Sequence, residues 1–142
     1  MIDNKDINIS EDDQGELYLL NIQKNADLIC IIADILSYSA TLESIELINS
    51  KYNNLDYTFN PDIPTLQSTI LSFLTRLIYT QIGIIRFNRV YNKKMNGEFE
   101  FSLNANSNIN LANIFKTIGS FYAVIAAIEI YYRDITQPIF GI

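Results

Sequence analysis

Apolar residues recur with helical periodicity over three long stretches of the chain, and the first stretch runs from about residue 11 to 50. Ser10 precedes three acidic residues, which is typical of a helix start because carboxylates favour the positive end of the helix dipole. On a helical wheel this stretch is apolar on nearly every side, apart from a narrow stripe that includes Asp27 and Asp34. We therefore expect this helix to be central in the fold or at an oligomer interface, with a possible break around residues 37–39.

The second and third stretches have clearer limits. The second is expected at about 63–93, from Pro64 in its first turn to the break at Gly97. The third is expected at about 110–135 and ends before Pro138. The length of 142 residues fits a single domain, in which residues 1–9 form an N-terminal arm and residues 136–142 an apolar tail.

The segments between these stretches alternate apolar and polar residues, which is typical of short strands. Residues 55–61 match residues 99–105 class by class, 44 positions later, although chance similarity in a biased composition explains the match equally well. We predict a mainly α fold: a bundle of three long helices, possibly four, with a short two-stranded β ribbon formed by the inter-helix connectors.

Composition excludes many kinds of chemistry. The chain has no histidine and one cysteine, so histidine acid–base catalysis, Ser-His-Asp or Cys-His systems and ordinary zinc, haem or iron–sulfur sites are excluded. We therefore expect no enzymatic activity, no cofactor and no metal. Isoleucine (25 residues) and asparagine (16 residues) are abundant, and their AT-rich codons point to a low-GC bacterium or its phage.

Hydropathy and charge suggest a cytoplasmic protein. The beginning of the chain lacks the pattern of a signal peptide, and the best uninterrupted apolar run, 117–128, is too short to cross a bilayer, so membrane association is unlikely on sequence grounds. The net charge is −6, divided into −9 for residues 1–62 and +3 for residues 63–142. Net acidity argues against nucleic-acid binding, and the uneven division favours pairing of the two halves, within one chain or between chains.

Two charged constellations are candidate sites. Arg86, Arg89 and Lys93 fall on one side of the second helix as a basic stripe. This stripe either binds phosphate, an acidic partner or the acidic N-terminal segment of another copy, or simply neutralises the acidic half. Asp27 and Asp34 lie two turns apart on the first helix as a possible buried polar pair, too far apart to share one ion unaided. Pairing with basic residues of the second helix is the simpler explanation for them.

Small and apolar residues supply candidate contact positions. Gly119, Ala123 and Ala127 recur every four residues on the third helix, where small side chains let another backbone approach closely. Phe140, in the apolar tail, is expected to pack on its own bundle or on a neighbour. These four positions are predicted to serve self-association or tight packing.

The function expected from these features is that of a non-enzymatic interaction or assembly protein that self-associates through apolar helix faces, as a homodimer or a higher assembly. The alternative is a small regulatory or immunity-type protein that binds one acidic partner through the basic stripe. In both cases the expected partner is a protein, either a copy of the chain itself or another one.

Overall fold

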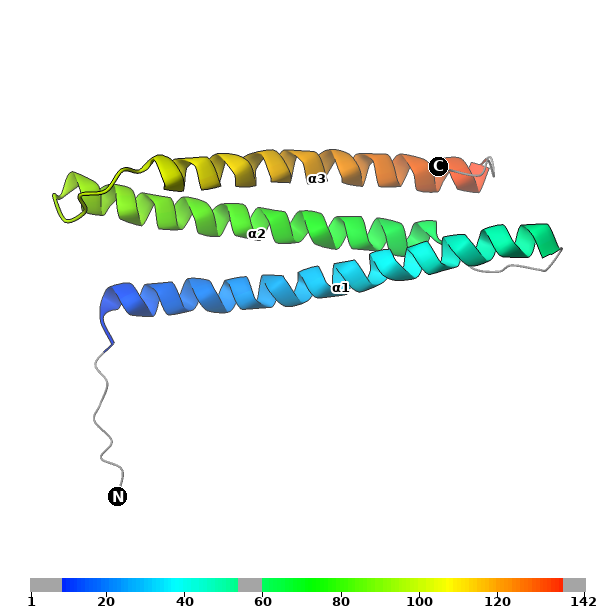
Figure 1. Ribbon diagram of the computed structural model, residues 1–142, viewed down its shortest axis with the longest axis horizontal. Coiled ribbons are helices and arrows are strands. Elements are labelled where there is room, and N and C mark those ends of the chain that lie inside the picture. The colour runs from blue at the N-terminus through cyan, green and yellow to red at the C-terminus, as the bar shows by residue number, and fades with distance from the viewer. Residues whose placement is uncertain (1–8, 54–59, 137–142) are drawn as a thin grey trace, which may run out of the picture.

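Three long helices make up the described part of the chain. The computed structural model describes residues 9–53 and 60–136, with side chains up to residue 133. The helices are α1 (Glu11–Asn53), α2 (Asp62–Met95) and α3 (Asn104–Thr136), with lengths of about 64, 51 and 50 Å at 1.5 Å per residue. They lie side by side with α2 in the middle (Figure 1). The prediction of three long helices is confirmed.

Local hydrogen bonds explain where the helices begin and end. The Ser10 hydroxyl accepts from the Asp13 amide at 3.2 Å and donates to the Asp13 carboxylate at 2.7 Å, which caps the start of α1. The end of α2 is closed by Gly97 at a φ of +76°, whose amide donates to the Lys94 carbonyl at 3.1 Å. Helix α1 is continuous through residues 37–39, and α3 begins six residues earlier than expected, at Asn104.

The predicted β ribbon is wrong. Residues 98–103 are irregular, Asn104 already belongs to α3, and no strand occurs within 9–53 and 60–136; residues 55–59 of the other segment lie outside the described ranges. The physical reason is geometric. One connector joins α1 to α2 and the other joins α2 to α3, so they lie at opposite ends of α2, about 50 Å apart (Figure 1). Two segments at that distance cannot pair.

The three-helix bundle is open. Helix α2 packs against both α1 and α3, whereas α1 and α3 have no contact with each other in the described ranges. The central helix is therefore α2, and the expectation that the first helix is central in the fold is wrong for the isolated chain. Helix α1 touches one neighbour only, which leaves most of its apolar surface uncovered.

The seam between α1 and α2 is built mostly from small and polar residues at seven-residue spacing, with Leu19 and Ile82 as larger apolar members. On α1 the buried positions are Leu19, Ala26, Ala33 and Ala40, and on α2 they include Ser68, Thr75 and Ile82. Ala33 is completely buried, and its carbonyl accepts a hydrogen bond from the Ser68 hydroxyl at 2.7 Å. A seven-residue repeat is the spacing of coiled coils, and alanine at its core lets the two backbones approach closely.

The seam between α2 and α3 is more polar still. The residues of α3 that turn toward α2 alternate at spacings of four and three: Asn106, Asn110, Asn113, Thr117, Ser120, Val124, Ala127 and Tyr131. The Thr80 and Thr117 hydroxyls bond across the seam at 2.8 Å. A Cβ added at Gly83 would lie 2.6 Å from the side-chain oxygen of Asn110, so glycine is what permits this approach.

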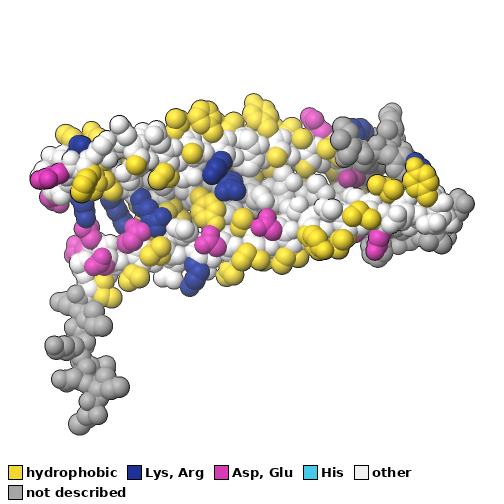
Figure 2. Space-filling model, in the orientation of Figure 1, with side chains coloured by type: hydrophobic (Ala, Val, Ile, Leu, Met, Phe, Trp, Pro, Cys, Tyr) yellow, Lys and Arg dark blue, Asp and Glu magenta, His cyan; other side chains and the backbone are white. Residues whose placement is uncertain are grey.

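The large apolar side chains lie on the outside. Figure 2 shows hydrophobic side chains along α1 and α3, where they face solvent in the single chain. Ile35 and Phe115, for example, are 61% and 65% exposed. The chain on its own thus leaves uncovered the kind of surface that a folded protein normally buries.

Candidate functional site

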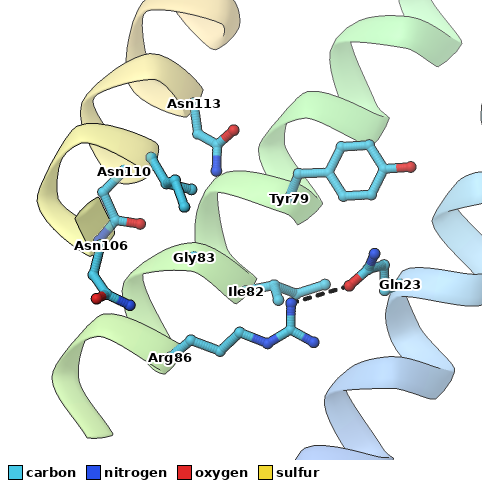
Figure 3. A pocket seen from close by; sticks show the side chains of 9 residues that line it. Gln23, Tyr79, Ile82, Gly83, Arg86, Asn106, Asn110 and Asn113 are labelled. Atoms are coloured by element: carbon cyan, nitrogen blue, oxygen red, sulfur yellow. Dashed lines mark hydrogen bonds between the residues drawn. The ribbon is translucent and has the colours of Figure 1, made fainter. Parts of the chain in front are cut away.

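A polar groove runs between the helices near the start of α3. It is an open pocket of about 290 Å³ with α2 as its floor, flanked by α1 and α3. Its polar lining, shown in Figure 3, comprises Gln23, Tyr79, Arg86, Asn106, Asn110 and Asn113. Amides, a guanidinium and a phenol can donate hydrogen bonds, and the amide and phenol oxygens can also accept them. The groove therefore offers hydrogen-bonding groups to a polar ligand.

The basic stripe is engaged by α1 of the same chain. Two guanidinium nitrogens of Arg86 contact the Glu16 carboxylate at 2.6 and 2.8 Å, and a third bonds to the Gln23 side-chain oxygen at 3.1 Å. Arg89 lies 3.7 Å from Glu16. A Cβ added at Gly15 would lie 2.7 Å from the Arg89 guanidinium, so a small residue there makes room for the arginine. The structure thus brings the three stripe residues together on α2, facing the acidic start of α1.

The third member of the stripe, Lys93, forms an exposed ion pair. Its ammonium donates to the Asp12 carboxylate at 2.6 Å. This hydrogen bond and the attraction between the two charges lower the pKa of Asp12 and raise the pKa of Lys93. Each charge thus stabilises the other at neutral pH. Figure 2 shows the same pairing of acidic and basic side chains near the start of α1.

The two aspartates predicted as a buried pair are both exposed on α1. Asp27 accepts a hydrogen bond from the Tyr79 hydroxyl of α2 rather than pairing with an arginine. Partial burial, followed by the bond to Asp27, raises the pKa of Tyr79 to about 12. Asp34 lies two turns further along α1, toward solvent. The expectation of burial is wrong: both carboxylates are exposed, although Asp27 reaches the Tyr79 hydroxyl of α2.

The small residues of α3 do not share one contact. Ala127 is buried against α2, whereas Ala123 is exposed and a Cβ at Gly119 would meet nothing within 4 Å. Four-residue spacing rotates slowly around a helix, which carries the three positions from an open side into the seam. Phe140 lies outside the described residues.

The outer seam of α1 is a second apolar seven-residue repeat, on the side opposite to α2. It consists of Leu28, Ile31, Ile35, Tyr38, Leu42 and Ile45, spaced three and four residues apart and all exposed. Alternating three- and four-residue spacing is the pattern by which one helix packs along another. Helix α1 therefore has two packing seams, of which the chain itself covers one.

Helices α3 and α2 carry comparable surfaces. The outer seam of α3, again opposite to α2, contains Leu111, Phe115, Ile118, Tyr122 and Tyr132, all exposed. Beside it runs an exposed column of small residues at seven-residue spacing: Ala105, Ala112, Gly119 and Ala126. The uncovered side of α2 presents Ile70, Leu74, Leu77, Ile84 and Tyr91.

Periodicity alone did not separate the inner seams from the outer ones. Reasoning from the sequence treats large apolar residues as core, whereas most inner positions here are alanine, serine, threonine or asparagine, with Leu19, Ile82, Val124 and Tyr131 as the larger exceptions. The available signal was the heptad spacing of Ala26, Ala33 and Ala40, which repeats without interruption. Asn106 was assigned to a connector, although it lines the polar groove together with Asn110 and Asn113.

Hydropathy makes each helix a candidate membrane span. Each contains an 18-residue window with no more than two charged residues and a mean hydropathy of 1.6, 1.3 and 1.6 for α1, α2 and α3, so all three are long and apolar enough by length and composition. The sequence prediction considered only uninterrupted apolar runs and found one short candidate. Among the described residues, no group of three or more acidic or cysteine side chains is placed to hold a metal ion.

Comparison of the chain with protein families, curated proteins and solved structures gives no match. The functional argument therefore depends on the residues and their geometry.

Proposed function

We propose that the protein is a non-enzymatic assembly protein that self-associates through the exposed apolar seams of its helices. The observation that carries this proposal is the outer seam of α1, where six large apolar residues follow the spacing of a helix-packing surface and face solvent in the single chain. A standard protein–protein interface buries about 800 Å² on each partner. The large exposed apolar side chains of α1 alone extend from Leu17 to Ile48, which supplies surface for contacts between copies.

A protein partner suits these seams better than a lipid bilayer does. Large exposed apolar residues of α1 extend from Leu17 to Ile48, or about 46 Å, whereas the hydrocarbon core of a bilayer is about 30 Å thick. Asp27 and Asp34 are exposed within that span. Carboxylates in the hydrocarbon region are costly, but at the flank of a helix–helix seam they remain in water. The same reasoning supports a cytoplasmic protein.

The alternative of a binder for one acidic partner receives less support. Its binding residues would be Arg86, Arg89 and Lys93, and all three already face Glu16 or Asp12 of the same chain. An external acidic partner would have to displace those carboxylates, which are tethered at high effective concentration. The stripe is better explained as a contact that fixes α1 on α2.

Sedimentation velocity of the purified chain over a range of micromolar concentrations tests the proposal. Self-association predicts a mass above 16.3 kDa that rises with concentration. The same measurement on a variant with Ile31→Glu and Leu42→Glu, on the outer seam of α1, should give smaller species. Asn25→Glu, an exposed change beside the seam, is the matched control. A soluble monomer at every concentration, or a monomer obtained only in detergent, refutes the proposal.

A further inference from the structure

We infer that the outer seam of α1 packs against the outer seam of α3 from the next copy of the chain, so that copies join edge to edge. This inference rests on the proposed function and specifies its contact. Its starting point is the placement of the two seams. Helices α1 and α3 form opposite edges of the three-helix layer (Figure 1), and the residues of each outer seam are exposed on the side of their helix opposite to α2. One repeated contact between unlike edges then covers both seams.

Charge disfavours the pairing of α1 with its own copy. Between Leu28 and Ile48, α1 carries three carboxylates, at Asp34, Glu43 and Glu46, and no basic residue. Both segments of such a pair would be net negative, so like charges would face each other. Between Ile109 and Tyr132, α3 carries one basic and one acidic residue. Because like charges across a helix pair destabilise the pair, α1 packs with less repulsion against α3 than against another α1.

Side-chain size also favours unlike edges. The outer seam of α1 consists of large side chains, with isoleucine or leucine at five of its six positions. Beside the large side chains of the outer seam of α3 runs the exposed column of three alanines and Gly119, and a Cβ added at Gly119 would meet nothing within 4 Å. Large side chains pack between helices when the facing helix offers space between its own side chains. The small-residue column therefore gives α3 room beside its own large side chains for those of α1.

The consequence is an assembly without a built-in stop. A contact between two different surfaces leaves one free α1 edge and one free α3 edge after each addition. The product is a closed ring if the rotation between copies closes, and a filament or sheet if it does not. A contact between two identical edges would instead give a two-fold dimer at that edge.

Cross-linking of single-cysteine variants tests which edges meet. In a Cys30→Ser background, cysteines are placed one at a time at the exposed positions Ile31, Ile35 and Leu42 of α1 and Phe115, Ile118 and Tyr122 of α3. Several positions on each helix allow for any register, and a short bismaleimide is the cross-linker. Circular dichroism confirms that each variant stays helical, as expected for changes at exposed sites.

Edge-to-edge packing predicts that an α1 variant mixed with an α3 variant gives cross-linked dimers, while each alone gives at least several-fold less. A chain with one cysteine on each helix should give a ladder of dimers, trimers and larger species. Strong cross-linking of an α1 variant with itself overturns the inference and leaves self-association standing. Oligomers without α1–α3 cross-links also overturn it. A monomer in sedimentation, or a monomer inserted in phosphatidylcholine vesicles, refutes the proposed function as well.

Discussion

Replacing Ile35 by alanine should weaken assembly while leaving the single chain folded. Ile35 lies in the middle of the outer seam of α1 and is 61% exposed, so little of its side chain contributes to folding of the chain alone. Alanine is also a better helix former than isoleucine, which offsets part of the lost contact with neighbouring side chains. Stability of the monomer against urea should therefore change by less than about 0.5 kcal/mol.

The effect on assembly follows from the area that remains to be buried. Complete burial of an isoleucine side chain contributes about 1.5–3 kcal/mol. Because roughly three-fifths of Ile35 is still exposed, its burial in an interface contributes about 1–2 kcal/mol. Each 1.4 kcal/mol corresponds to a tenfold change in dissociation constant, so Ile35→Ala should raise the dissociation constant by about 5- to 30-fold for each contact.

Sedimentation equilibrium, or light scattering over a dilution series, measures this change. Asn25→Ala serves as the control, since Asn25 is exposed on the same helix but lies outside the outer seam. The control should shift the dissociation constant by less than about twofold. Equal shifts for the two variants, or none for Ile35→Ala, would show that the outer seam of α1 is not where copies meet. A large loss of helicity would instead show that Ile35 is needed within the chain.

Three further expectations concern contacts inside the chain. Glu16→Gln should lower the free energy of unfolding by about 0.5–1 kcal/mol, because it weakens the bonds of Glu16 to the half-exposed Arg86. Urea titration should show a smaller loss in 1 M salt, and no loss at low salt would disprove the role of the pair. Ala33→Leu should cost about 1–3 kcal/mol because Ala33 is completely buried at the seam with α2; an unchanged urea midpoint would mean that the seam is looser than described. Tyr79 should ionise at about pH 12 in ultraviolet titration, and the stabilisation from its raised pKa is complete below pH 10 and lost as the pH rises toward 12. Asp27→Asn should lower that pKa while burial keeps it above 10, and an unshifted titration would contradict the hydrogen bond.

The sequence was sufficient to locate the three helices but not to predict which face of each helix is buried. Helical periodicity, the cap at Ser10 and the break at Gly97 depend on interactions within a few residues, so the three elements were predictable. The predicted β ribbon depended on a long-range contact, because the two connectors would have had to lie side by side. A 34-residue helix between them forbids that, and this length was visible in the sequence.

The candidate site shows the same division. The clustering of Arg86, Arg89 and Lys93 follows from their spacing on one helix, and the charge division between the two halves of the chain indicated carboxylate partners. Which carboxylates they meet depends on how far α1 extends along α2, and no residue pattern fixes that offset. The polar groove depends in part on Asn106, which was assigned to a connector because asparagine is unfavourable inside helices and common in loops.

The missing contact between α1 and α3 also decides how the chain loses its structure. Each outer helix is stabilised only by its nearest neighbour, as in a short repeat array, so α1 can detach from α2 without disturbing the pairing of α2 with α3. Amide hydrogens of α1 should then exchange at their own rate rather than through one cooperative opening of all three helices. A further copy that packs against the α1 edge would give α1 a second neighbour. The amide hydrogens of α1 should then exchange more slowly, and this slowing would detect assembly in a single helix.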